Sequence, residues 1–285
     1  AEIQDCHNPY DSFALHKAAL IACGIIPMEG EADLEKILDE MGGGFYMSTR
    51  VKGVPKGSGL GTSSILSGAC VRALGKFLGT NWSDSDVYEL VLNLEQIMST
   101  GGGWQDQVGG LTGGIKYITS RPGMKQKLKV EYLDLDEATK TELQERFVLI
   151  YTGQRRLARN LLRDVVGNYI SGKKESKEAL EEMKHLAVMM RYELEQGDVD
   201  AFARMLNEHW EVSKKLDAGS TNTCIDQIFA SCEDLIDGKF ISGAGGGGFL
   251  QVILKKGVSK EMLRAQLLDV YQDSGVDVWD AEFVW

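Results

Sequence analysis

The sequence predicts an α+β protein, because helix-like and strand-like segments mix without the regular alternation of a doubly wound sheet. Hydrophobic residues make up 43% of the chain and charged residues 26%, as in globular proteins that bury a core. Three glycine-rich clusters interrupt the chain, and the third lies between two strand-like stretches. A chain of 285 residues is long enough for two domains, and we expect residues 1–150 and residues 151–285 to form one each.

The first half of the chain predicts three helices and one strand. Apolar spacing predicts a helix over 12–23, and alternation with β-branched residues predicts a strand over 44–54. A helix over 62–78 follows, with an expected buried stripe of Ile65, Ala69, Ala73 and Phe77.

The helix expected over 84–98 begins with a capping box made by Ser83 and Asp86. Its apolar face comprises Val87, Leu90, Val91, Leu94 and Met98. Glu95 lies four residues after Val91 and three before Met98, so its carboxylate is expected at the edge of that buried face.

After this helix, the sequence predicts strands at 115–119, 127–135 and 147–153, followed by a long helical tract over roughly 155–235. Breaks in this tract are expected near 171–173, 197–198 and 217–219, where glycine occurs. Residues 239–256 then predict a strand, a glycine loop and a second strand. A helix near 259–273 and a strand near 276–284 close the chain.

Composition narrows the classes of function. The net charge of −11 argues against a nucleic-acid partner, which requires clustered basic residues, and no apolar run is long enough to predict a membrane partner. The five cysteines are odd in number and scattered, so we expect reduced thiols and a cytoplasmic location. The cysteines and four histidines lack zinc-site spacing. A small anion held by backbone amides remains compatible with the acidic charge.

The first glycine cluster stands directly before the helix over 62–78. It contains Gly57, Gly59 and Gly61 and continues into three hydroxyl residues at 62–64. Neither the P-loop pattern nor the dinucleotide fingerprint fits, because no lysine follows the last glycine and Thr62 occupies the third glycine position of the fingerprint. Two interpretations stay open: a phosphate held at the helix start, or a tight turn capped by hydroxyls.

The other two clusters bear on the same chemistry. Residues 101–110, GGGWQDQVGG, hold a single acid, Asp106, which suits a general base, a metal ligand or an ordinary turn cap. Residues 243–248 formally match G-x-G-x-x-G, but a strand-like stretch follows where a dinucleotide site needs a helix. That loop either wraps a ligand or packs tightly on another loop. Serine-hydrolase, zinc-protease and protein-kinase motifs do not occur.

The order and spacing of the three clusters resemble the GHMP kinase superfamily. Residues 55–64 resemble its phosphate loop P-x-x-x-G-L-G-S-S-A, with Thr62 and Ser63 matching the two serines, and residues 243–248 resemble its C-terminal glycine loop. Glu95 and Asp106 match its metal-binding glutamate and catalytic aspartate. The resemblance implies a two-domain fold with a partial ribosomal-S5-like N-terminal domain and a ferredoxin-like C-terminal domain.

Within the superfamily, residues 94–110 and 151–158 are most similar to the L-fucokinase branch. The resemblance implies ATP-dependent phosphorylation of L-fucose to L-fucose 1-phosphate, in the salvage of GDP-fucose, with ATP and Mg²⁺ as cofactors. It also implies a fused or adjacent nucleotidyltransferase domain as partner. The alternatives are another sugar kinase of the same superfamily, acting on a heptose phosphate or galactose, and an inactive truncated nucleotide-binding module.

The resemblance assigns roles residue by residue. Asp106 is the expected catalytic residue, and Ser63 and Glu95 are the expected Mg²⁺ ligands. Trp104 is expected either against the sugar or in the core, and Arg155 or Arg156 either at a phosphate or on the surface. The expected ATP contacts are Pro55, Gly57, Ser58, Gly59, Leu60, Gly61, Thr62, Ser63 and Ser64. The expected sugar contacts are Gly103, Trp104, Gln105, Gly243, Ala244, Gly245, Gly246 and Gly247.

One family motif has no counterpart. No segment reads like P-x-R-[IV]-[DN]-[LIFV]-x-G-G, which in the superfamily supplies sugar contacts and a basic partner for the catalytic aspartate. The chain begins at Ala1 rather than at a methionine. We therefore expect a chain that lacks the first portion of the family's sequence.

Overall fold

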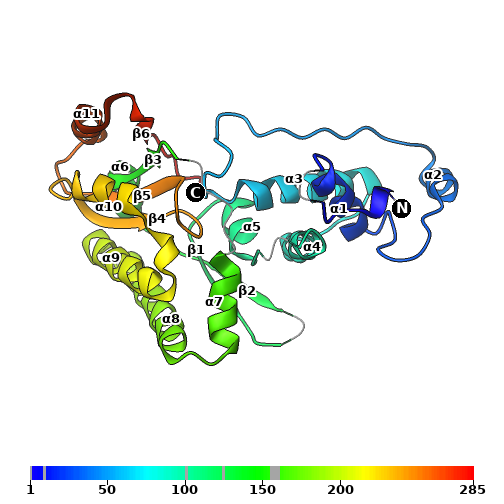
Figure 1. Cartoon of the computed structure of the whole chain (residues 1–285), viewed down its shortest axis with the longest axis horizontal. Helices are drawn as coiled ribbons and strands as arrows, with labels where there is room; N and C mark the ends of the chain where they lie inside the picture. Colours follow the sequence, from blue (N-terminus) through cyan, green and yellow to red (C-terminus); the bar gives the residue numbers. More distant parts are fainter. Residues whose placement is uncertain (1, 9–10, 100–101, 124–125, 155–160) are drawn as a thin grey trace. The chain divides into compact units, whose positions relative to one another are not determined.

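The computed structural model describes residues 2–8, 11–99, 102–123, 126–154 and 161–285, the side chains of 161–163 excepted. The chain divides into two compact units. The helical unit comprises Ala1–Val54 and Gly61–Thr112, and the sheet unit comprises Pro55–Leu60 and Gly113–Trp285. Figure 1 shows the helices and strands of both in sequence colours. None of the described helices is long and apolar enough to span a bilayer.

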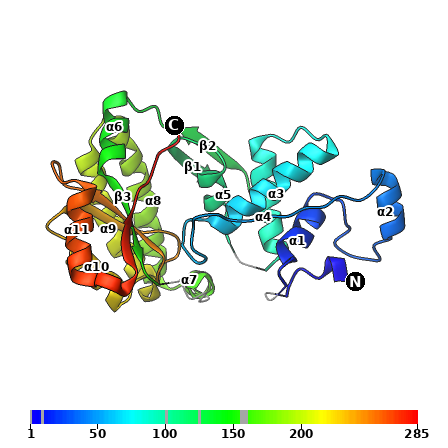
Figure 2. The same cartoon turned by 90° about the horizontal axis from the view of Figure 1, so that it is seen from above.

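The described residues of the helical unit form a short 3₁₀ turn and five α-helices. They are η1 (Glu2–Gln4), α1 (Ala14–Ala22), α2 (Leu34–Met41), α3 (Thr62–Leu78), α4 (Asp84–Ile97) and α5 (Gln105–Gly110). Helices α1, α3 and α4 pack on one another (Figure 2), and their shared core includes Ala18, Cys70, Val71, Leu74, Val87, Val91 and Leu94. The predicted bounds of α3 are confirmed, as is the capping box of Ser83 and Asp86 at the start of α4.

The buried stripe predicted for α3 is wrong. Ala69, Ala73 and Phe77 are exposed, and the buried face carries Ser64, Ser67, Gly68, Cys70, Val71, Leu74 and Gly75 instead. Small residues face inward because bulky neighbours fill the space above them: Leu111 packs on Gly68, and a Cβ on Gly75 would lie 2.7 Å from Trp82 Cε3. Close packing therefore selects the face with the smaller side chains.

The strand predicted over 44–54 is also wrong. The segment is extended but belongs to no sheet of the described structure, although intermediate and exposed residues partly alternate along it. Its apolar residues are largely uncovered, with Phe45 half-exposed against Phe77 and Tyr46 91% exposed. The alternating pattern specifies an extended backbone, whereas a strand also requires a hydrogen-bonded neighbour.

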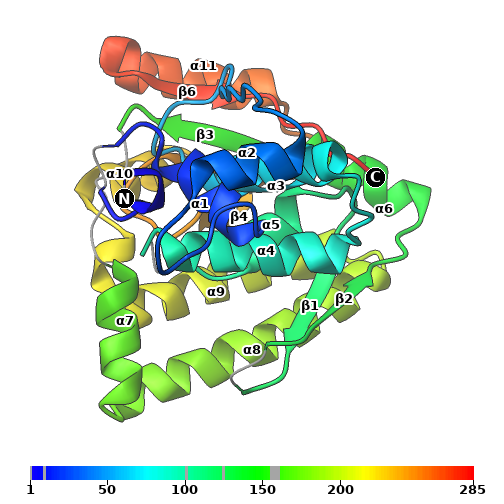
Figure 3. The same ribbon diagram turned by 90° about the vertical axis from the view of Figure 1, so that its right-hand side faces the viewer.

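The sheet unit contains two antiparallel sheets. Strands β1 (Lys116–Ser120) and β2 (Leu128–Tyr132) form one. Arg191 of α8 (Lys174–Glu195) stacks on Tyr117 and pairs with Glu131, and these two contacts join the sheet to α8. Figure 3 shows the ribbons of β1, β2 and α8. The larger sheet has the order β4-β5-β3-β6. Its strands are β3 (Phe147–Thr152), β4 (Ile236–Ile241), β5 (Phe249–Leu254) and β6 (Val276–Trp279).

Helices cover the larger sheet and close its core. The predicted helical tract resolves into α7 (Leu161–Ile170), α8, α9 (Val199–Leu216), η2 (Ala218–Ser220) and α10 (Thr223–Ala230), with breaks where they were predicted. Three further elements are α6 (Glu137–Arg146), α11 (Lys260–Tyr271) and η3 (Gln272–Ser274). Helix α9 packs on β4, and Trp210 is buried among sheet residues.

The α+β fold class is confirmed by this mixture of helices and antiparallel sheets. The two compact units are not divided at residue 150. The family's domain boundary near that residue stays a prediction. Strand β3 crosses that position and pairs with both β5 and β6, so pairing draws residues 113–150 into the same unit as the end of the chain.

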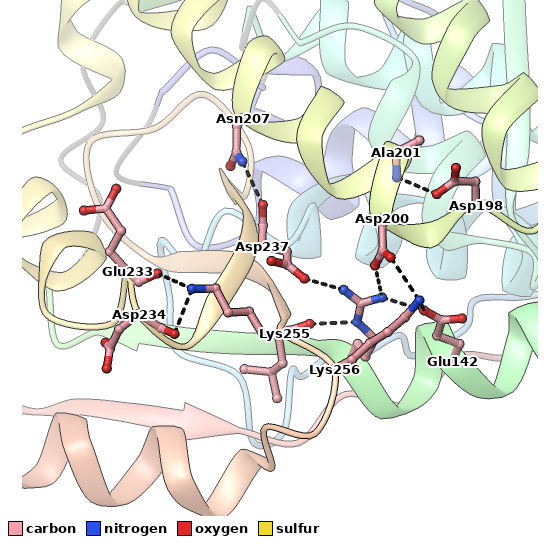
Figure 4. A network of polar contacts seen from close by, with 12 residues as sticks. Glu142, Asp198, Asp200, Ala201, Asn207, Glu233, Asp234, Asp237, Lys255 and Lys256 are labelled. Atoms are coloured by element: carbon pink, nitrogen blue, oxygen red, sulfur yellow. Dashed lines mark hydrogen bonds and ion pairs between the residues drawn. The ribbon is translucent and has the colours of Figure 1, made fainter.

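A buried arginine joins four elements of the sheet unit. The guanidinium of Arg146, at the end of α6, donates to Glu142, Asp200 and Asp237 and to the backbone oxygen of Leu254. Lys256 adds ion pairs to Asp200 and Glu142 (Figure 4). Because its partners come from α6, α9, β4 and β5, this cluster fixes the helices against the sheet.

We expect Arg146→Ala to lower the free energy of unfolding by about 3–5 kcal/mol, because removal of a buried charged partner leaves carboxylates without compensation. The matched control is Arg191→Ala, since Arg191 also pairs with two acids but is more exposed, and its loss should cost about 0–1 kcal/mol. Urea unfolding followed by circular dichroism measures both. Equal losses in the two variants would contradict the role given to Arg146.

The same cluster predicts a pH dependence. Hydrogen bonds from Lys256 and then Arg146 lower the pKa of Asp200 from its ordinary value of 3.8. Because the pKa of Asp200 is lower in the folded protein than in the unfolded chain, the ionised carboxylate stabilises the fold at pH values above 3.8. This contribution is lost as the pH falls from 3.8 through the pKa of Asp200 in the folded protein. As the pH falls through that window, the free energy of unfolding should therefore decrease less in Asp200→Asn than in the wild type, as measured by urea titrations at each pH. If the two free energies decreased in parallel, the ion pairs of Asp200 would not contribute to the pH dependence of stability.

Candidate active site

In the helical unit, the candidate site starts at the N-terminus of α3. Its N-cap, Gly61, has a left-handed backbone with φ of +64° and supplies no side-chain cap. The first-turn amides therefore keep the positive end of the helix dipole without a local carboxylate or hydroxyl acceptor at the cap position. Such a helix start suits an anion.

Asp106 lies against this helix start. A Cβ on Gly61 would come 2.9 Å from the Cβ and 3.0 Å from the Cγ of Asp106. Glycine is thus required at position 61 both by space and by backbone conformation. Asp106 itself is exposed in the first turn of α5, directly after Trp104 and Gln105.

One turn into α3, Ser64 donates a hydrogen bond to Glu95 of α4. Both side chains are buried, Ser64 at 4% and Glu95 at 6% exposure. Burial raises the pKa of the Glu95 carboxyl, the Ser64 hydrogen bond opposes this shift, and the charge of Asp106 adds to it. The two acids are therefore close enough to interact electrostatically.

The hydroxyl that contacts Glu95 differs from the one assigned from the sequence. Ser64 bonds Glu95, whereas Ser63 is exposed and its backbone oxygen accepts from Ser67. The assignment of Ser63 as a metal ligand stays a prediction. The periodicity could have indicated Ser64, because Ser64, Ser67 and Gly68 lie at i, i+3 and i+4 on one helix face.

In the sheet unit, residues 55–60 pack against the third glycine cluster, as the sequence allowed. Ser58 is buried, and its backbone oxygen accepts from Phe249 at 2.9 Å. A Cβ on Gly248 would collide with the Ser58 oxygen, and a Cβ on Gly59 would collide with the Ser242 oxygen. The glycines of both loops are therefore explained by direct backbone contact.

Two further segments, at residues 152–154 and at Ser220, hold the third cluster. Gly246 donates to the Ser220 oxygen at 2.9 Å, Gly248 donates to the Gln154 oxygen at 3.0 Å, and Thr152 donates to the Gly248 oxygen. Gly245 packs directly on Ser220. The loop is thus pre-organised by backbone bonds, which is the arrangement that a binding loop requires.

The remaining predicted residues divide between the units. Gly61, Thr62, Ser63, Ser64 and Glu95 lie with residues 103–106 in the helical unit, while Pro55, Gly57, Ser58, Gly59 and Leu60 lie with residues 243–247 in the sheet unit. Trp104 is half-buried, which decides neither the sugar nor the core interpretation. Arg155 and Arg156 lie outside the described residues.

The donor set of the helical unit fits a magnesium ion that is shared with a phosphate. Carboxylate and hydroxyl oxygens are the ligands that Mg²⁺ prefers. Across the described part of the chain, no three His, Cys, Asp or Glu side chains gather as a metal cluster. A cation held by Glu95 and one hydroxyl of this helix start would therefore keep water and ligand oxygens, as Mg²⁺ does in nucleotide sites.

Comparison with known proteins agrees with this chemistry. The Arabidopsis thaliana bifunctional fucokinase/GDP-fucose pyrophosphorylase is 36% identical over 95% of this chain. The Bacteroides fragilis L-fucokinase/L-fucose-1-P guanylyltransferase is 34% identical over 89%. The chain spans about a quarter of the length of these two relatives, 24% and 27% respectively. A Campylobacter jejuni D-glycero-alpha-D-manno-heptose 7-phosphate kinase is 28% identical over 69% of this chain and 58% of its own.

The fold has solved counterparts. The Methanococcus jannaschii mevalonate kinase superposes with a TM-score of 0.67 at 16% identity, covering 100% of this chain and 80% of that one. Residues 32–114 match the family of GHMP kinase N-terminal domains, and residues 190–272 match the family of GHMP kinase C-terminal domains. Together the two matches span more than half of the 285 residues. Both domain matches and the similarity to the two L-fucokinases place this chain in the GHMP kinase family.

Proposed function

We propose that this chain is an ATP-dependent sugar 1-kinase that phosphorylates L-fucose to L-fucose 1-phosphate. The observation that carries the proposal is the position of Asp106 against Gly61, at the uncapped start of α3 and beside the Ser64–Glu95 pair. The similarity to two L-fucokinases over about nine-tenths or more of this chain supports the choice of sugar.

In this proposal the residues divide the work of phosphoryl transfer. The first-turn amides of α3 and the glycines of residues 57–61 hold phosphate oxygens. Asp106 accepts the proton of the anomeric hydroxyl, or orients that hydroxyl, as the hydroxyl oxygen bonds to the γ-phosphorus, the bond between the γ-phosphorus and the bridging oxygen breaks, and ADP leaves. Ser63 and Glu95 hold Mg²⁺, with Ser64 fixing the Glu95 carboxylate through their hydrogen bond. Bound MgATP supplies the phosphoryl group and a cation that offsets negative charge.

The other residues of the proposal contact the sugar. Trp104 offers an apolar ring to the sugar face, with Gly103 and Gln105 beside it in sequence. The loop 243–247 borders the sugar in the same proposal. A nucleotidyltransferase domain is the proposed partner, because both L-fucokinase relatives carry a second activity in their names.

A second candidate is a heptose-phosphate kinase. It is favoured by the similarity to the heptose 7-phosphate kinase from Campylobacter jejuni. The residues proposed for the nucleotide, the cation and proton transfer fit either acceptor, because those roles concern the donor and the transferred group.

The first test is ADP release with MgATP and a panel of L-fucose, D-galactose, heptose 7-phosphate and mevalonate. We expect turnover with L-fucose, and Asp106→Asn should reduce it by about 10²–10⁴-fold while MgADP still raises the melting temperature. Turnover with another acceptor would overturn the sugar assignment. If none of the four acceptors led to ADP release, the result would favour the inactive nucleotide-binding module. An Asp106→Asn variant as active as the wild type would remove Asp106 from the mechanism.

A second test concerns the cation. Glu95→Gln should raise the Mg²⁺ concentration for half-maximal activity by at least about tenfold, because it removes a charged ligand. Ser64→Ala should shift the titration in the same direction by about 10-fold, since it releases the hydrogen bond that orients Glu95. Ser67→Ala is the matched control, because Ser67 is a buried α3 serine that bonds Ser63 rather than Glu95.

Unchanged Mg²⁺ titrations in Glu95→Gln and Ser64→Ala would assign this pair to structure alone. A shift in Ser67→Ala as large as that in Ser64→Ala would attribute the effect to α3 packing rather than to the carboxylate.

A further inference from the structure

The buried side chain of Gln107 has no hydrogen-bond partner among the described residues. It is 0% exposed, and both its amide nitrogen and its amide oxygen are unsatisfied. A glutamine amide carries two donor hydrogens and an acceptor oxygen, and buried groups of this kind are almost always paired. His16 Nδ1 is the other unsatisfied atom, but the opposite ring nitrogen of His16 lies 3.0 Å from the Thr49 hydroxyl.

The contacts of α5 place Gln107 beside the proposed site. Helix α5 runs along the first half of α3, with Asp106 against Gly61 and with Gly110 so close to Ile65 that a Cβ would lie 2.5 Å from Ile65 Cδ1. Gln107 follows Asp106 in α5 and precedes Gly110, so it belongs to the part of α5 that these two contacts hold against α3. Helix α5 also packs on α4, which carries Glu95.

Packing alone does not explain an amide at this position. Methionine has a similar length and volume, a comparable helix propensity and no amide group to satisfy. Burial of an unpaired amide costs free energy, so methionine would be the more stable choice for a purely structural residue. Groups retained at the expense of stability tend to serve function.

We propose that Gln107 is a positioning residue of the phosphoryl-transfer site, whose amide gains hydrogen-bond partners when the magnesium nucleotide binds. This inference rests on the proposed function. Mg²⁺ keeps several of its waters in nucleotide sites, and water supplies both a donor and an acceptor to an amide. With these hydrogen bonds formed, Gln107 keeps α5 and its neighbour Asp106 in position relative to the Ser64–Glu95 pair.

The test compares Gln107→Met, which removes the amide, with Gln107→Asn, which retracts it by one methylene. Melting temperatures are measured with and without MgADP, and steady-state kinetics are measured with MgATP and sugar. The control is Gln4→Met, which removes an amide that is paired with Pro27 and Gly30 in the same unit.

We expect Gln107→Met to keep or raise the melting temperature without ligand and to lose at least half of the stabilisation by MgADP. Its kcat should fall by about 10–100-fold, while the KM for sugar changes less than about threefold, as for other groups that act through a neighbour. Gln107→Asn should fall between Gln107→Met and the wild type. Gln4→Met should keep the MgADP shift of the wild type.

A wild-type MgADP shift and kcat in Gln107→Met would overturn this inference and leave the proposed function intact. Failure of both variants to fold would show that the amide is required by the fold itself and would also overturn it. A wild-type protein that MgADP does not stabilise would reject the proposed function, and this inference with it.

Discussion

The approach of Asp106 to the backbone of Gly61 is the constraint on which the candidate site depends. The contact leaves no room for a Cβ at position 61, and the left-handed backbone there starts α3 without a side-chain cap. One glycine thereby aligns an acid with the positive end of a helix dipole. The contacts of Gly68 with Leu111 and of Gly110 with Ile65 continue this close packing along both helices.

In the sheet unit, two backbone segments approach each other equally closely at glycines. Residues 57–59 and the glycine loop approach so closely that Gly59 and Gly248 have no space for side chains. Backbone amides of the loop and of the strand after it donate hydrogen bonds to the backbone oxygens of Ser58, Gln154 and Ser220, and these bonds fix the loop. A loop built in this way keeps its amides oriented before a ligand arrives, which lowers the cost of binding.

Stability is concentrated away from these loops. The candidate site contains a buried carboxylate and a buried amide that has no partner among the described residues, and burial of each costs free energy. The sheet core around Trp210 and the ion cluster of Arg146 contain few such features and hold helices and strands together. This division is typical of proteins in which a rigid scaffold supports a strained functional site.

Local sequence determined the elements whose signals are local. The capping box at Ser83, the start of α3 after Gly61 and the breaks in the helical tract all follow from residues within one turn of each boundary, and the structure confirms them. The order of the glycine clusters and the two acids resembles that of the GHMP kinases, and the phosphate site that this resemblance implies stays a prediction.

Tertiary structure decided what depends on distant neighbours. Leu111 and Trp82 pack on Gly68 and Gly75 of α3, and these contacts with residues outside α3 cannot be read from the sequence of α3 alone. The segment 44–54 has a strand pattern but no partner strand, and Ser64 rather than Ser63 contacts Glu95 because α4 lies on that side of α3. A sequence pattern specifies backbone geometry and burial tendency, whereas packing and pairing need a second surface, which only the folded chain supplies.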